Sequence, residues 1–197
     1  MLEPTDLLVE LSLEHRELTR ASADLRRRGD HTADAVRAIT IDLVEHELAH
    51  RLLVHPLLRR DERGRLLFTE RREEQLLLAD RLRHALATTQ GDGARHVPEH
   101  VVEGLDQQLV AHADREEIVC FPHVRRVVDR DELARLGALR RPLGDAIRRR
   151  LDDDDTPVVD GSWATTSRRD LPALLDLDHD LIIELPDLAT PEGAASA

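Results

Sequence analysis

Two stretches of the chain place two histidines, or a histidine and a glutamate, one helical turn apart. One, HELAHRLLVHP, begins at His46, and the other, HADREEIVCFP, begins at His112. Residues four apart lie on one face of a helix, so His46 and His50 point the same way, as do His112 and Glu116. Neutral imidazole and carboxylate groups are ligands for metals such as iron and zinc. The two stretches therefore predict a metal site to which at least two helices contribute.

Four segments with a helical spacing of apolar residues would carry these side chains. In each segment the residues expected to face the core recur every three or four positions and form a stripe along one face of the helix. The four stripes span residues 8–25, 39–57, 71–85 and 102–123. Each stripe is interrupted by polar residues, namely His15 in the first, His46 and His50 in the second, Gln75 in the third, and His112 and Glu116 in the fourth. A lone inward histidine or glutamine is usually a hydrogen-bonded core residue. Because an unsatisfied buried polar group costs roughly 1–3 kcal/mol, several such groups at one level of a core favour a shared metal ion.

The same segments predict an all-α fold. Four long helices joined by short loops are typical of an up-down-up-down four-helix bundle, which we expect over residues 1–151 together with a fifth helix from about Asp131 to Leu151. Pro56 should interrupt the second helix. In the fourth helix the stripe predicts that Val119 and His123 face the core. Residues 152–197 form an acidic extension that we expect to be irregular and partly disordered, with an apolar segment suited to binding a protein partner.

Composition excludes several classes of protein. The formal net charge of −12 argues against a nucleic-acid partner, since such proteins usually carry a basic patch. The single cysteine, Cys120, fits a reducing cytoplasm. No apolar run is long enough for a membrane span, and the N-terminus lacks the pattern of a signal peptide, so we expect a cytoplasmic protein without a membrane partner.

The fourth-helix stretch HADREEIVCFP resembles the signature of hemerythrin-like proteins of the HHE cation-binding family, and the resemblance extends from about Asp6 to Leu151. Members of this family hold a non-haem di-iron centre inside a four-helix bundle. Their pattern is a histidine on the first helix, His-x-x-x-Glu on the second, a histidine on the third and His-x-x-x-Glu on the fourth. The matching residues are His15, His46, His112 and Glu116. The resemblance implies iron as cofactor and the handling or sensing of dioxygen, nitric oxide or peroxide.

Two positions depart from the family pattern. His50 stands where the family has a glutamate that bridges the two irons, and Gln75 stands where the third helix gives a histidine. Only Glu116 is then placed as a carboxylate ligand. Either a di-iron centre survives with altered ligands, or one ion, iron or zinc, is bound by a histidine-rich set that includes His50, with Gln75 as a weak oxygen ligand.

The sequence is also compatible with two other interpretations. The chain could be a metal-poor helical bundle that acts as a regulatory or interaction module, or a structural protein with a single zinc ion. No proton-handling residue stands out in the sequence, so it does not decide whether the protein is an enzyme.

Overall fold

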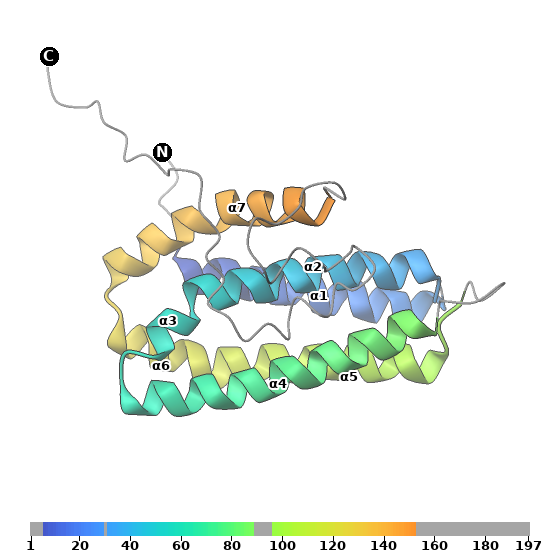
Figure 1. The fold of residues 1–197 in the computed structure, drawn as a ribbon, viewed down its shortest axis with the longest axis horizontal. Coiled ribbons are helices and arrows are strands. Elements are labelled where there is room, and N and C mark those ends of the chain that lie inside the picture. Colours follow the sequence, from blue (N-terminus) through green and yellow to red (C-terminus); the bar gives the residue numbers. More distant parts are fainter. Residues whose placement is uncertain (1–5, 30, 89–95, 153–197) are drawn as a thin grey trace, which may run out of the picture.

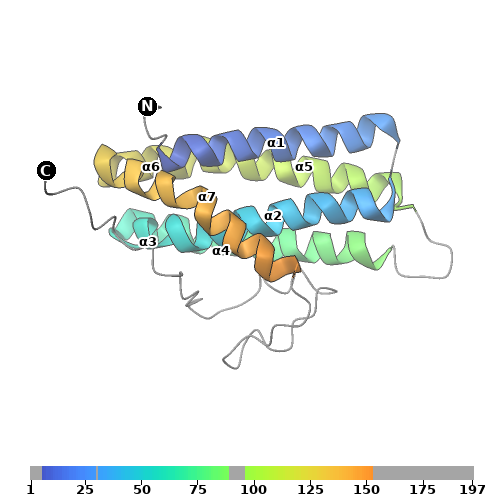
Figure 2. The ribbon, with the colours of Figure 1, turned by 90° about the horizontal axis from the view of Figure 1, so that it is seen from above.

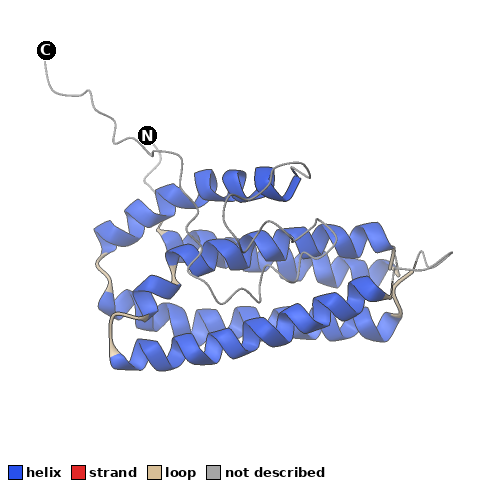
Figure 3. Cartoon of the chain, viewed as in Figure 1, coloured by secondary structure: helices blue, strands red, loops and turns tan. Residues whose placement is uncertain are grey.

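The described part of the chain is helical in all its named elements. The computed structural model describes residues 6–29, 31–88 and 96–152. The elements in chain order are α1 (Leu7–Arg28), α2 (Ala33–Leu53), α3 (His55–Leu58), α4 (Glu62–Ala87), α5 (Glu99–Arg115), the π-helical turn η1 (Glu116–Cys120), α6 (Phe121–Val127) and α7 (Arg130–Asp152). Within these ranges there is no β-strand, and the single isolated bridge joins Thr32 and His96 (Figures 1 and 3). The prediction of an all-α fold is confirmed for this part of the chain.

Local sequence signals set the ends of the first two helices. The Asp6 carboxylate accepts a hydrogen bond from the backbone N–H of Val9 at 3.0 Å and caps α1. Gly29 ends α1 with φ of 64°, a left-handed conformation that glycine adopts without a steric penalty. The Thr32 hydroxyl accepts from the N–H of Ala35 at 3.4 Å at the start of α2. These caps make α1 and α2 two separate long helices joined by a short connection.

Pro56 divides the second predicted helix, as expected from the sequence. α2 ends at Leu53 and α3 begins at His55, with Pro56 in its first turn, where the missing amide hydrogen costs least. The break turns His55 toward the core. Its side chain is buried, and its ring centroid lies 5.3 Å from that of His50.

Four long helices lie side by side and enclose an aliphatic core. α1 packs against α2 and α5, and α4 packs against α2 and α5 (Figures 1 and 2). Leucine, valine and alanine side chains provide nearly all of the apolar core. None of the described helices is both long and apolar enough to cross a membrane.

The fifth predicted helix is α7, which packs on α1 and α2. It runs obliquely over them in Figure 2 and continues through Pro142 as one helix. Arg140 and Arg148 of α7 form ion pairs with Glu45 of α2, at 3.1 and 2.5 Å. The predicted extension over residues 152–197 lies outside the described residues, apart from Asp152, which ends α7.

The π-helical turn η1 moves the inward face of the fourth predicted helix by one residue. The backbone N–H of Phe121 donates to the carbonyl of Glu116, five residues earlier, so this turn contains one residue more than an α-helical turn. As a result Val119 turns away from the core and is 38% exposed, while Cys120, four residues after Glu116, is fully buried. The prediction that Val119 faces the core is therefore wrong. His123 is buried as predicted and contacts Asp61 at 3.2 Å.

Thiol labelling tests this register. In native wild-type protein we expect no labelling of Cys120 by a maleimide reagent, and one labelled thiol after unfolding in guanidinium chloride. The Val119→Cys variant should label at one thiol when native and at two when unfolded, read by mass spectrometry, because only position 119 is accessible. A protected Val119→Cys thiol in the native variant would show that the helix continues without the π turn.

Candidate metal centre

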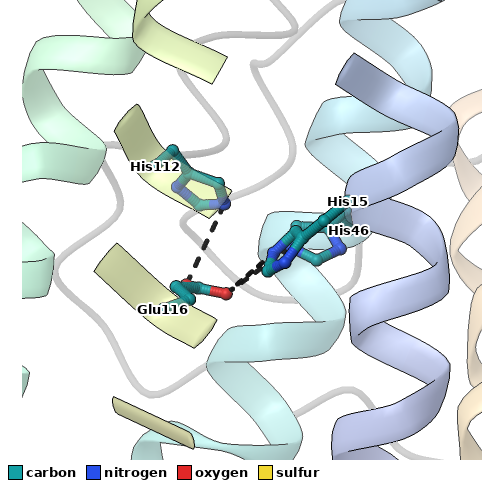
Figure 4. A group of neighbouring side chains, drawn as sticks. All are labelled: His15, His46, His112 and Glu116. Carbon is teal, nitrogen blue, oxygen red and sulfur yellow. Dashed lines mark hydrogen bonds and ion pairs between the residues drawn. The ribbon is translucent and has the colours of Figure 1, made fainter. Parts of the chain in front are cut away.

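Four of the predicted ligands converge in the middle of the helical core. His15 comes from α1, His46 from α2, His112 from the end of α5 and Glu116 from the first position of η1. All four are buried, and one ligand atom from each lies within 4.8 Å of those of the others (Figure 4). Three imidazoles and one carboxylate so arranged could hold a metal ion.

The Glu116 carboxylate is the common contact of this group. Its Oε2 atom lies 3.0 Å from Nε2 of His15 and 3.9 Å from Nε2 of His46. Its Oε1 atom lies 3.0 Å from Nε2 of His50 and 3.9 Å from Nε2 of His112. Burial raises the pKa of Glu116, but Arg71, His50 and His112 outweigh burial and hold it well below its usual range. Glu116 is thus a carboxylate anion, the form that binds a metal.

Two further glutamates orient the histidines from behind. Nδ1 of His15 lies 3.0 Å from Oε1 of Glu117, and Nδ1 of His46 lies 2.8 Å from Oε2 of Glu14. Both rings are therefore fixed with Nε2 turned toward Glu116. A carboxylate on the remote ring nitrogen is the usual support for a metal-binding histidine, because it sets the tautomer and makes the ligand more basic.

The support of His46 extends to the fifth helix. Arg140 of α7 binds the Glu14 carboxylate through two contacts of 2.8 Å. Burial lowers the pKa of His46, but Glu116 and Glu14 together raise it to about 9. The Nε2 atom of His46 is buried without a hydrogen-bond partner. An orphaned nitrogen aimed at a carboxylate oxygen is a position that a metal ion would satisfy.

The ring of His15 is also held by an aromatic contact. Phe121, which follows η1, stacks on His15 with ring centroids 5.7 Å apart and ring planes inclined by 7°. Phe121 is buried because the π turn carries it to the inward face. The turn thus contributes both a ligand, Glu116, and a support for the ring that faces it.

Arg71 was not predicted to have a role at this site, but its side chain lies beside the predicted ligands. Its guanidinium, from α4, is only 1% exposed. The Nη2 atom lies 2.5 Å from Oε1 of Glu116 and 3.5 Å from Oε1 of Glu47, and it donates to Nδ1 of His112 at 3.2 Å. Nη1 donates to Glu74 at 2.8 Å. Arg71 begins the stripe of the third segment. That position was the one sequence feature that could have indicated that its side chain faces the core.

Glu47 of α2 is a second buried carboxylate that the sequence did not indicate. It is fully buried, with Oε1 3.2 Å from Nε2 of His112. Burial raises its pKa, but His112 and Arg71 lower it to about 2, so Glu47 is an anion. It follows His46 directly and therefore falls outside the stripe on which the prediction depended.

The two positions that depart from the family pattern lie on the side of the group occupied by Glu47 and Arg71. The Gln75 amide donates to Oε2 of Glu47 at 2.6 Å and accepts from Arg51 at 3.2 Å. Gln75 is therefore engaged by its neighbours, one residue removed from the four converging ligands. His50 contacts Glu116 directly, and burial lowers its pKa, so its ring is neutral.

Comparison with protein-family models, with curated proteins and with solved structures gave no match to this chain.

Removing Arg71 should destabilise the metal-free protein. Arg71→Ala leaves Glu47 and Glu116 buried without their guanidinium, and the loss of one partner of a buried ion pair costs about 3–5 kcal/mol. Urea denaturation followed by circular dichroism measures the free energy of unfolding. The matched control is Arg115→Ala, which also removes an arginine that pairs with Glu74. Because the Arg115 side chain is 52% exposed, this substitution should cost less than about 1 kcal/mol. Equal losses in both variants would contradict a central role for Arg71.

Proposed function

We propose that this chain is a hemerythrin-like protein that binds non-haem iron in its helical core and handles or senses dioxygen, nitric oxide or peroxide. The side-by-side packing of α1, α2, α4 and α5 supports an up-down-up-down bundle of that class. The observation that carries the proposal is the convergence of three buried imidazoles and one buried carboxylate.

The donor set suits iron. His15 and His46 present Nε2, each with Nδ1 bound to a carboxylate, and Glu116 presents Oε2 between them. Two imidazoles and one carboxylate on one side of an ion are the ligand set of many non-haem iron sites, with His112 within reach as a fourth group. Iron would supply a redox-active ion with positions open to a small ligand.

The surroundings of the centre exclude bulk water. Buried leucines come from each of the four helices α1, α2, α4 and α5, namely Leu11, Leu43, Leu53, Leu78 and Leu109. A small uncharged molecule such as dioxygen or nitric oxide crosses such an apolar layer at low cost, whereas an ion does not. This selectivity fits a diatomic or peroxide ligand.

A second candidate function, a metal-free interaction module, is favoured by one observation. Arg71 already supplies a cation to Glu116 and Glu47, so the core is partly neutralised by the chain itself. A single structural zinc ion would use the same ligands as iron and differs from it in having no redox chemistry.

Metal analysis of two histidine variants tests the proposal. His15→Ala should lose most of its bound iron because it removes an imidazole at Oε2 of Glu116, whereas His84→Ala, an exposed histidine of α4, should retain wild-type content. Iron per chain is measured by elemental analysis after purification from iron-replete cells. Absorption changes on addition of nitric oxide to the ferrous protein distinguish iron from zinc. An absence of metal under all growth and reconstitution conditions would favour the interaction module.

The orientation of His46 provides a separate prediction. Glu14→Gln weakens the support of the His46 ring, and loss of such a partner typically lowers metal affinity by about 10–100-fold. Competition with a chelator measures the affinity. Glu17→Gln, an exposed glutamate on the same helix, is the control and should leave the affinity unchanged. An effect of equal size in the two variants would mean that only net charge matters.

A further inference from the structure

The two oxygens of the Glu116 carboxylate face different surroundings. Oε2 faces Nε2 of His15 and of His46, at 3.0 and 3.9 Å. Oε1 faces the Arg71 guanidinium at 2.5 Å and Nε2 of His50 at 3.0 Å. A carboxylate that bridged two metal ions would use one oxygen for each. Here one oxygen faces imidazoles, and the other already contacts a cation that belongs to the chain.

The Nη2 atom of Arg71 lies where a second ion would need to bind. It contacts Oε1 of Glu116, Oε1 of Glu47 and Nδ1 of His112, which are contributed by three different elements. Metal ions bind such oxygen and nitrogen atoms at about 2.0–2.2 Å, so an ion and this nitrogen cannot share the position. The guanidinium therefore occupies the space between these three donor groups.

The contact with His112 has a further consequence. Because Nδ1 accepts from Arg71, a neutral His112 ring carries its proton on Nε2, an assignment that follows from the hydrogen bond. That nitrogen faces Oε1 of Glu47 at 3.2 Å. Both Arg71 and Glu47 thus contact the His112 ring, so this imidazole adjoins the Oε1 side of Glu116 as well as the four converging ligands.

Charge leads to the same conclusion. Glu47 and Glu116 bring two negative charges to the core, and Arg71 brings one positive charge, which leaves one negative charge for a bound ion to offset. One divalent ion then leaves an excess of one positive charge. Two divalent ions beside Arg71 would leave an excess of three in a buried site, where unpaired charge is costly.

We infer that the Arg71 guanidinium takes the place of a second metal ion, so that the centre is mononuclear and its ion lies on the Oε2 side of Glu116. This inference rests on the proposed function and specifies it. Arg71 is a specificity-determining residue: it fixes how many ions the four helices hold.

Gln75 completes this arrangement. It lies one turn after Arg71 on α4, and both side chains contact the Glu47 carboxylate. Histidines at these two positions would direct two imidazoles toward Glu47 and Glu116 in place of a guanidinium and an amide. The pair is thus the place where a second metal site can be opened by substitution.

Ion counting in four proteins tests the inference. Wild type, Arg71→Lys, Arg71→His/Gln75→His and the control Arg115→Gln are each loaded anaerobically with excess ferrous iron and freed of unbound metal. Elemental analysis gives iron per chain, and circular dichroism verifies helix content. We expect about one ion in wild type, Arg71→Lys and Arg115→Gln, and about two in the double variant.

A measurement of affinity provides a second readout should the double variant fail to fold. Arg71→Gln removes the charge and should bind its ion at least about tenfold more tightly than wild type, because the site becomes more negative. Arg71→Lys keeps the charge and should remain within about threefold of wild type.

The outcomes separate the inference from the proposed function. Two ions in wild type, one ion in a folded double variant, or no gain in affinity in Arg71→Gln would overturn the inference while iron binding stands. An absence of iron from all four proteins would overturn the proposed function and the inference with it.

Discussion

The compensation of buried negative charge is the constraint on which the centre of this protein depends. Glu47 and Glu116 are both fully buried, and neither could remain ionised in an apolar core without partners. Their partners come from each of the surrounding long helices, through the imidazoles of His15 and His112 and the guanidinium of Arg71. The helices are therefore fixed relative to one another by polar contacts as well as by the packing of leucine side chains.

This compensation extends outward through a second layer of charges. Glu14 holds the His46 ring and is itself held by Arg140, while Arg140 and Arg148 also neutralise Glu45. Through these contacts α7 becomes part of the support of the centre. Such a layered arrangement leaves little freedom to the His46 ring, which favours a defined metal geometry over an adaptable one.

The sequence predicted the part of the site that follows helical periodicity. His15, His46, His112 and Glu116 were found because each interrupts an apolar stripe, and a buried polar residue in such a stripe needs a partner. Arg71 begins its stripe, but arginine is so rarely buried that its residue type gave no indication of a role in the core. Residues outside the stripes could not be recognised in this way, because they do not interrupt an apolar stripe. Glu47 and Glu45 are buried because helices pack on more than one face of α2, which depends on how distant segments assemble.

The π turn is the other feature that spacing could not reveal, since a stripe is read by assuming a constant number of residues per turn. The turn has a local cost and occurs in proteins mostly where it serves a site. Here the wider turn lets two consecutive glutamates approach one ring, with Glu116 on Nε2 of His15 and Glu117 on Nδ1. On a regular α-helix consecutive side chains diverge by about 100°, which opposes such an approach. The same turn then places Phe121 against the face of that ring. Three residues of one short segment thus surround a single imidazole of α1, and a helix that only had to fill an aliphatic core would not require this arrangement.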